Sequence, residues 1–396
     1  SATLGLRIPG PRKEGAAVSK WAGKYIIGLT GNIGTGKSVV RRMLEHLGAY
    51  GIDADALSHR AIARGAPGYQ SVVDSFGKYI LDANGEVDRL RLGRLVFADS
   101  EALLHLENII HPLVTQAVDY LIKRSKQPVV VIEAIKLLES PLAARCDSLW
   151  TVYIPPELQA ERLVKQRGMS LADAQQRIAA QPSQEQKIAA ANVVIRNAES
   201  FENTWKQVVA AWRKTVPVQE EAQQTPLTPA NLGVTEFQVV RGRPRHSQEI
   251  AALLSRLKGG LTATSEDVMA MFGEKAFLML QAGNEMKGLA GWQVENLVSR
   301  TTDLVIDPAI PLGRAIPAMV KEIEKASRDL QCEASLVFVE PQLARQEEIW
   351  RGLGYQKAAP ESLEVLAWQD AAKESMPAGA VLLFKKLRQD RILRPI

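Results

Sequence analysis

The stretch Gly31-Asn32-Ile33-Gly34-Thr35-Gly36-Lys37-Ser38 decides the fold of the first half of this chain. It follows the short apolar run Tyr25–Thr30, and from Lys37 to Leu47 apolar residues recur at helical spacing. The order is therefore strand, glycine-rich loop and helix. The loop fits the pattern G-x-x-x-x-G-K-[ST], which in this context predicts a phosphate-binding loop.

Each residue type in this loop suits a nucleoside triphosphate. The glycines let backbone N–H groups turn inward around the β-phosphate, and the positive end of the following helix dipole adds to them. Lys37 supplies a mobile charge to the β- and γ-phosphates, and the Ser38 hydroxyl is placed for the Mg²⁺ that bridges them. We therefore expect ATP and Mg²⁺ to be the cofactors. The residues expected to bind the nucleotide are Thr30, Gly31, Asn32, Ile33, Gly34, Thr35, Gly36, Lys37 and Ser38.

The residues after this loop alternate between strand and helix patterns. Apolar runs typical of buried strands occupy 127–132, 149–154 and 192–195. Helical periodicity covers 101–110, 113–123, 157–167 and 171–180. This alternation predicts an α/β fold with a parallel sheet and helices on both of its faces.

The chain is long enough for two domains. Its 396 residues exceed the usual size of a single hydrophobic core, so we expect two domains of about 200 residues each. Prolines, glutamates and glutamines without periodicity fill 217–233, which predicts a linker. The predicted domains are then 24–216 and 234–396, preceded by a flexible extension at 1–23 that contains no apolar stretch long enough for a signal peptide.

Composition excludes several classes of protein. Hydrophobic residues make up 46% of the chain and charged residues 23%, the balance of a soluble globular protein, and no run has membrane-spanning length. The 49 basic and 44 acidic residues are too evenly mixed to predict a nucleic-acid partner. Cys146 and Cys332 are the only cysteines, which favours a reducing cytoplasm over a disulfide framework. The sequence does not indicate an oligomeric state.

Residues 25–216 resemble the dephospho-CoA kinase family of P-loop kinases. The resemblance rests on segments in the family's order and spacing: 28–38, Ile52-Asp53-Ala54-Asp55, Ile110-His111-Pro112, Leu137-Leu138-Glu139, Gln181 and Arg196-Asn197. It implies a kinase with a helical lid that phosphorylates the 3′-hydroxyl of dephospho-CoA. Another P-loop nucleoside or nucleotide kinase, or a nucleotide-regulated scaffold that binds CoA, is the alternative.

Asp55 is the candidate catalytic carboxylate. A strand that ends at Ile52-Asp53 delivers Asp55 to the carboxyl edge of the sheet, where it can orient the acceptor hydroxyl and take its proton. The alternative role for Asp55 is that of a helix N-cap, since helical residues follow it. Asp53 is a secondary candidate, as an indirect ligand of Mg²⁺ or as a polar residue at the strand end.

Four further residues are candidates for the site. The resemblance places Arg162 and Arg167 in the lid, where guanidinium groups would neutralise charge on the transferring phosphoryl group, although exposed helical arginines are often only solvated. His111 is expected either to contact substrate phosphate or ribose, or to start a helix together with Pro112. Lys136 replaces the family's usual proline and would pair either with a CoA phosphate or with Glu139.

Residues 234–396 show a mixed α+β pattern that resembles the Gcn5-related acetyltransferase fold. The resemblance lies in Phe237–Gly242, in the strand pair across Gly283–Asn284 and in 350–355. Such a domain would bind acetyl-CoA or CoA. However, the segment where that fold grips the CoA pyrophosphate carries Pro308 and Pro311 here, which remove backbone donors. We therefore expect either acetyl transfer, with Tyr355 as proton donor, or a non-catalytic domain that binds CoA, a partner or the kinase domain.

Overall fold

The computed structural model describes residues 21, 23–179, 181–217, 237–257, 262–283 and 285–389, and for Phe97, Gln166 and Arg167 it describes the backbone. The chain divides into two compact units, one ending at Pro217 and one within 218–391. Most of the predicted extension 1–23 and of the predicted linker 217–233 lies outside the described residues. The two units are described separately below.

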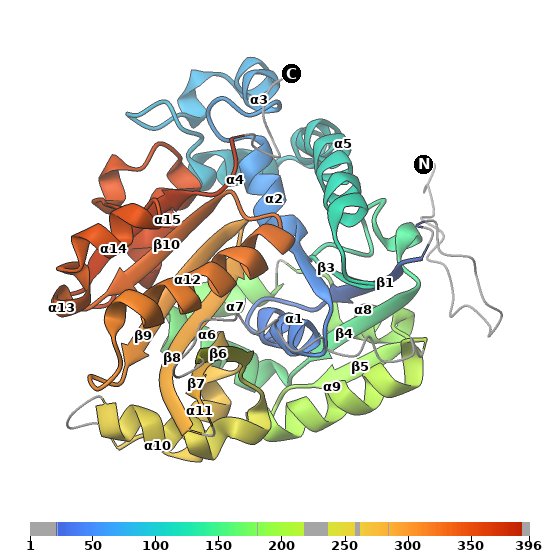
Figure 1. The fold of residues 1–396 in the computed structure, drawn as a ribbon. Coiled ribbons are helices and arrows are strands. Elements are labelled where there is room, and N and C mark those ends of the chain that lie inside the picture. The colour runs from blue at the N-terminus through green and yellow to red at the C-terminus, as the bar shows by residue number, and fades with distance from the viewer. Residues whose placement is uncertain are drawn as a thin grey trace. The chain divides into compact units, whose positions relative to one another are not determined.

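The first unit contains a five-stranded parallel sheet in the order β2-β3-β1-β4-β5 (Figure 1). Its strands are β1 Tyr25–Thr30, β2 Tyr50–Asp53, β3 Val129–Glu133, β4 Ser148–Tyr153 and β5 Val193–Arg196. Its helices are α1 Lys37–His46, α2 Ala54–Ala61, α3 Tyr69–Phe76, α4 Arg89–Ala98, α5 Ser100–Arg124, α6 Pro156–Arg167, α7 Leu171–Ala179, α8 Gln184–Ala190 and α9 Phe201–Thr215, with short 3-10 turns at Lys78–Ile80 and Ala143–Arg145. The predicted α/β fold is confirmed.

Helices cover both faces of this sheet because its central strands are apolar on both sides. All five residues of β3 are buried, as are five of the six in β1. On one face, α1 and α9 pack against the sheet through Val40, Met43 and Val208. Figure 1 shows α5 on the other side of β1 and β3. Full burial of such side chains stabilises the fold by about 1.5–3 kcal/mol each. This packing holds β1 and β3 in place, so the positions of the residues at their carboxyl ends are well defined.

The strand order predicts a ligand site at the edge of the sheet where β1 and β3 end. The chain leaves β1 towards β2 on one side of the sheet, and it leaves β3 towards β4 on the other side. Ligands of open α/β sheets bind outside the carboxyl ends of the strands at such a point of reversal. The phosphate-binding loop follows β1, and the segment that begins at Ala134 follows β3.

One helix prediction is wrong. The patterns 101–110 and 113–123 belong to the single helix α5, and Pro112 lies inside it. His111 therefore sits within a helix and does not start one. Pro112 has no N–H to give to the carbonyl of Asn108, but its position is exposed, so water can satisfy that carbonyl.

The second unit contains a seven-stranded mixed sheet in the order β11-β12-β10-β9-β8-β7-β6. Its strands are β6 Phe237–Arg241, β7 Ala276–Ala282, β8 Glu285–Glu295, β9 Val298–Ile306, β10 Ala334–Val339, β11 Gln356–Lys357 and β12 Val381–Lys386. Its helices are α10 Ser247–Leu257, α11 Ser265–Met271, α12 Leu312–Asp329, α13 Pro341–Ala344, α14 Glu347–Gly352 and α15 Leu366–Ser375, with 3-10 turns at Pro244–His246 and Pro360–Ser362. Only β9 and β10 pair in parallel, joined by a crossover that contains α12. The mixed α+β prediction is confirmed, although the sequence reading missed α11, α13, α15 and β11.

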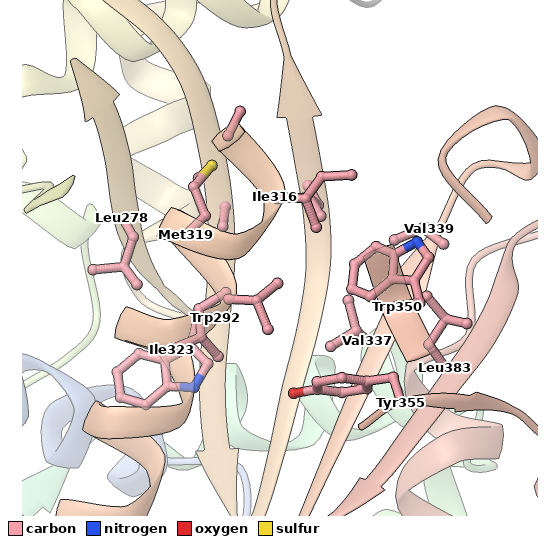
Figure 2. Packing of buried hydrophobic residues seen from close by; sticks show 14 of the residues in the cluster. Leu278, Trp292, Ile316, Met319, Ile323, Val337, Val339, Trp350, Tyr355 and Leu383 are labelled. Atoms are coloured by element: carbon pink, nitrogen blue, oxygen red, sulfur yellow. The ribbon is translucent and has the colours of Figure 1, made fainter. Parts of the chain in front are cut away.

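The core of this unit lies between α12 and one face of the sheet (Figure 2). Ile316, Met319 and Ile323 of α12 are fully buried in it. The Trp350 ring meets the Tyr355 ring edge-on, with 5.8 Å between the ring centroids, and the Tyr355 hydroxyl donates to Ser335 Oγ at 2.8 Å. Burial raises the pKa of Tyr355, so its hydroxyl stays protonated.

Candidate functional site

The phosphate-binding loop has backbone angles that glycine favours. Gly31 and Gly36 have φ values of 150° and 88°. A Cβ on Gly31 would stand 2.6 Å from the carbonyl oxygen of Val152, and one on Gly36 would stand 2.1 Å from Nδ2 of Asn197. Gly36 is also the N-cap of α1, and no side chain caps that helix end. Its first amides therefore suit an anion better than a side chain.

Side chains from later in the chain hold this loop from behind. Gln181 Oε1 accepts from the Ile33 N–H at 2.7 Å, and Gln159 Nε2 donates to the Ile33 carbonyl at 2.7 Å. Asn197 Nδ2 donates to the Thr35 carbonyl at 2.9 Å. These bonds join the loop to the start of α6, to the segment before α8 and to the end of β5, so the loop is fixed before any ligand binds.

Lys37 and Ser38 lie at the predicted end of the loop. Lys37 Nζ donates to the Asn32 carbonyl at 3.3 Å. Ser38 Oγ donates to Glu133 Oε1 at 2.9 Å, while the other Glu133 oxygen accepts from Arg41 Nε at 2.7 Å. Glu133, the last residue of β3, is only 4% exposed, so this carboxylate is an added member of the site. The sequence pattern that could have indicated Glu133 is a charged residue at the end of an otherwise apolar strand.

Two aspartates begin helix α2 beside Glu133. The strand register pairs Asp53 with Glu133 across β2 and β3. Asp53 Oδ1 accepts from the Ala56 N–H at 2.8 Å and is the N-cap of α2. The alternative assignment of Asp55 as the cap is therefore wrong, because the helix begins one residue before Asp55. Asp55 Oδ2 instead accepts from the Ile135 N–H at 3.0 Å, which ties it to the segment after β3.

Burial changes the proton affinity of both aspartates. It raises the pKa of Asp53 to about 6, helped by the Glu133 charge and opposed by Arg41 and the Ala56 N–H. It also raises the pKa of Asp55, against the Ile135 N–H and the Lys37 charge. A carboxylate with a raised pKa is a stronger base, as a group that accepts a hydroxyl proton needs to be.

The structure places the side chain of only one of the two lid arginines, Arg162. Arg162 Nη2 donates to the Asn197 carbonyl at 2.7 Å, and its Nη1 lies 3.9 Å from where a Cβ on Gly36 would stand. The structure therefore brings Arg162 to the loop. Helix α6 ends at Arg167 before Gly168 in a left-handed conformation, as the sequence predicts, but the side chain of Arg167 lies outside the described residues.

Lys136 and His111 lie away from these contacts. Lys136 Nζ donates to Glu107 Oε1 of α5 at 3.0 Å, so the predicted pairing with Glu139 is wrong. A partner 29 residues away in sequence cannot be seen from local spacing. Among the described side chains, no hydrogen bond joins His111 to the phosphate-binding loop or to Asp55.

The sequence reading missed Lys187. This residue of α8 is 1% exposed, and its Nζ donates to Asn32 Oδ1 and to the Ile135 carbonyl, both at 2.8 Å. Burial lowers the pKa of Lys187 to about 8; Glu139 and Asp55 oppose that change and Lys37 adds to it. A lysine in a short polar helix carries no local signal of burial, so it resembled a surface residue.

Comparisons with known proteins match the first unit. A family model described as dephospho-CoA kinase matches residues 25–203. The dephospho-CoA kinase of Geobacter sulfurreducens is 41% identical over 195 residues, which are 48% of this chain and 99% of the relative. The chain belongs to the dephospho-CoA kinase family. The dephospho-CoA kinase of Aquifex aeolicus is 44% identical over 183 residues, which are 46% of this chain and 93% of that relative.

Solved structures are similar to each unit at low overall scores. A dephospho-CoA kinase from Campylobacter jejuni is 26% identical, with a TM-score of 0.33, and the match covers 49% of this chain and 98% of that one. A GNAT-family acetyltransferase from Staphylococcus aureus is 8% identical, with a TM-score of 0.30, and the match covers 38% of this chain and 99% of that one. At these scores the second likeness decides nothing about activity.

The described residues contain no helix with the length and apolar character needed to span a membrane.

In the second unit, α12 begins after Pro311, whose carbonyl accepts from the N–H groups of both Arg314 and Ala315. The bond from Ala315 is the regular first-turn bond of a helix, while Pro308 and Pro311 provide no N–H groups.

Proposed function

We propose that the first unit transfers the γ-phosphoryl group of ATP to the 3′-hydroxyl of dephospho-CoA, giving CoA and ADP. The observation that carries this proposal is the position of Asp55. Its carboxylate accepts a hydrogen bond from the Ile135 N–H, in the segment after β3. It also lies close enough to Lys37 of the phosphate-binding loop for the lysine charge to lower its pKa. A base beside a phosphate-binding loop suits phosphoryl transfer to a hydroxyl group. Membership in the dephospho-CoA kinase family indicates that this hydroxyl is the 3′-hydroxyl of dephospho-CoA.

The loop and Lys37 bind the triphosphate, and Asp55 orients the acceptor hydroxyl and takes its proton as the new phosphate ester forms. Arg162, and Arg167 after it in α6, neutralise charge on the transferring group. Phosphoryl transfer depends mainly on such positioning and charge compensation, because the reaction needs little covalent chemistry from the protein. Lys136 and His111 are proposed contacts of the acceptor.

The oxygen donors beside Ser38 fit Mg²⁺. Ser38 Oγ and the Glu133 carboxylate are in contact, and Asp53 is paired with Glu133 across the strands. Among the described residues, no group of three or more His, Cys, Asp and Glu side chains is arranged as a metal site. Mg²⁺ is usually bound through one or two protein oxygens together with substrate phosphates and water, so Ser38 and Asp53 suffice. When bound, the ion neutralises charge on the β- and γ-phosphates.

The test is ADP release from Mg-ATP by the full chain with dephospho-CoA, adenosine, AMP or no acceptor. We expect turnover with dephospho-CoA alone, and we expect Asp55→Asn to lower kcat by about 10²- to 10⁴-fold, the usual contribution of a general base. Lys37→Ala should also abolish turnover. Lys206→Met, at an exposed ion pair with Glu202 of α9, is the matched control.

The other possible outcomes would each indicate a different function for this chain. Turnover with adenosine or AMP would make this a different nucleoside or nucleotide kinase. Binding of ATP without any acceptor-stimulated ADP release would leave a nucleotide-regulated scaffold. We expect the enzyme to act in the cytoplasm, where ATP is available and its two free thiols stay reduced.

A further inference from the structure

The backbone of Ile33 connects the phosphate-binding loop to helices α6 and α7. Its N–H donates at 2.7 Å to Oε1 of Gln181, which follows α7. Its carbonyl accepts, also at 2.7 Å, from Nε2 of Gln159 in α6. Both backbone groups of this loop residue are therefore bonded to side chains that belong to these two helices or follow them directly.

The side chain of Ile33 packs against the same two helices. It forms a small apolar cluster with Leu163 of α6, which is 1% exposed, and Ala174 of α7, which is fully buried. The cluster is completed by the partly buried residues Val164, Met169 and Ile178. A Cβ on the neighbouring Gly34 would stand 3.4 Å from Leu163 Cδ2, so the leucine lies directly on the loop. The hairpin of α6 and α7 therefore rests on the loop through Ile33.

The face of α6 that meets Ile33 also carries Arg162. Arg162 and Leu163 come three and four residues after Gln159, so the three side chains share one face of the helix. The Arg162 guanidinium donates to the Asn197 carbonyl at 2.7 Å. Because a helix moves as a rigid element, a shift of Leu163 away from Ile33 also moves the backbone of Arg162.

The loop pattern does not by itself account for an isoleucine at position 33. In G-x-x-x-x-G-K-[ST] that position accepts any residue, and a phosphate gains nothing from an apolar side chain. Ile33 is nevertheless only 9% exposed, and its neighbours in the cluster come from α6, α7 and the turn between them. The burial of Ile33 therefore serves the position of these helices.

We propose that Ile33 is a positioning residue that holds α6 against the phosphate-binding loop and so places the Arg162 guanidinium beside the transferring phosphoryl group. This inference rests on the proposed phosphotransfer, because Arg162 has that role only in this reaction. The loop then serves two purposes, since it binds the triphosphate and also supports the arginine. The arginine is held near the loop before ATP binds, which reduces the rearrangement needed during transfer.

The experiment compares the full-length wild type with Ile33→Ala, Arg162→Ala and the double variant. Leu171→Ala is the matched control, because Leu171 of α7 is 57% exposed and its truncation removes a similar side chain from the same hairpin, outside the cluster. Hydrogen exchange of the α6 amides is measured in the ligand-free proteins. The other two measurements are kcat with dephospho-CoA and the affinity for Mg-ADP by calorimetry.

Ile33→Ala should speed hydrogen exchange in α6 and lower kcat by about 10- to 100-fold, the cost of a small misplacement of a positioned group. Affinity for Mg-ADP should change little, because ADP lacks the phosphoryl group on which Arg162 acts. When Arg162→Ala is already present, Ile33→Ala should lower kcat hardly further, since the two residues act as a unit. A merely structural role would instead lower kcat by the same factor with or without Arg162. Leu171→Ala should match the wild type in all three measurements.

The results distinguish a failure of this inference from a failure of the proposed function. If the wild type does not phosphorylate dephospho-CoA, the proposed function fails, while exchange in α6 still shows whether Ile33 holds that helix. Unchanged exchange in Ile33→Ala refutes the support of α6. An equal loss of kcat in both backgrounds, or a loss confined to Mg-ADP affinity, overturns the link to Arg162. Should Ile33→Ala not fold, Ile33→Val removes a single methyl group in its place. A loss of kcat that disappears without Arg162 then supports the proposal, and an unchanged kcat overturns it.

Discussion

Removing the charge of Asp53 should stabilise the ligand-free first unit at neutral pH. The pKa of Asp53 is raised from 3.8 to about 6, first by burial and then by Glu133. A rise of about two units corresponds to about 3 kcal/mol, at about 1.4 kcal/mol per unit. Because part of this rise belongs to the neighbouring Glu133 carboxylate, we expect Asp53→Asn to gain about 1–2 kcal/mol. Asparagine caps helices as well as aspartate does, so the bond to Ala56 survives.

The sign of this effect depends on pH. A carboxyl group whose pKa is higher in the folded state binds more protons there, so wild-type stability falls as pH rises from 3.8 towards 6. Above that window, the advantage of Asp53→Asn is complete. Below 3.8 the wild-type group is protonated in both states, and the advantage should disappear.

The two cysteines allow each unit to be followed separately. Cys146 lies in the first unit and Cys332 in the second, and both are buried free thiols. The protein is equilibrated in urea and given a brief pulse of a thiol reagent, and labelling of each cysteine is read by mass spectrometry. The Cys146 midpoint should rise in Asp53→Asn at neutral pH, while the Cys332 midpoint stays constant. Asp99→Asn, at an exposed N-cap of α5, is the matched control and should change neither.

Two results would refute this reasoning. One is a Cys146 midpoint in Asp53→Asn that is equal to or lower than that of the wild type at neutral pH. The other is a gain that persists below the ordinary aspartate pKa, because such a gain would not come from relief of a buried charge. The same variant should lose Mg²⁺-dependent turnover if Asp53 serves the metal, which would make the instability a cost of function.

Further predictions use the same assays. Asn197→Ala removes the donor to the Thr35 carbonyl, so it should lower the free energy of unfolding followed by Cys146 by about 1–3 kcal/mol and raise KM for ATP; an unchanged KM would show that the loop does not need this support. Lys136→Ala breaks a half-exposed ion pair worth about 0–1 kcal/mol, so KM for dephospho-CoA should rise at nearly constant stability, and an unchanged KM would exclude the substrate contact. Tyr355→Phe removes the bond to Ser335 and should lower the free energy of unfolding followed by Cys332 by about 1 kcal/mol without changing ADP release, whereas a loss of ADP release would link the second unit to the kinase reaction.

The sequence predicts the sheet and the phosphate-binding loop well because both depend on local patterns. Fully apolar runs mark β1 and β3, whose burial on both faces removes the need for alternation. The glycines of the loop are required by backbone angles that the local sequence itself sets. Strand ends of the first unit are accordingly predicted to within one or two residues.

The parts that sequence did not predict depend on distant partners. Lys187 contacts Asn32 across 155 positions, and Asn197 contacts Thr35 across 162. No periodicity or motif carries such pairings, and a buried lysine has the same local pattern as an exposed one. The helix start predicted at Pro112 was wrong for a different reason. A proline on the exposed side of a long helix destabilises it little, because water can satisfy the free carbonyl, so Pro112 neither starts nor ends α5.

Burial shifts the pKa values of the acidic and the basic groups of the site in opposite directions. The pKa values of Asp53 and Asp55 are raised and that of Lys187 is lowered, so the ligand-free protein disfavours both signs of charge at this site. A bound divalent cation would favour the carboxylates, and bound phosphates would favour the lysines. Arg41, Lys37 and the N–H groups of Ala56 and Ile135 relieve part of this cost in the free protein. Under the proposed function, bound Mg-ATP would relieve more of it, so the cost of these charges would favour the bound state in which phosphoryl transfer occurs.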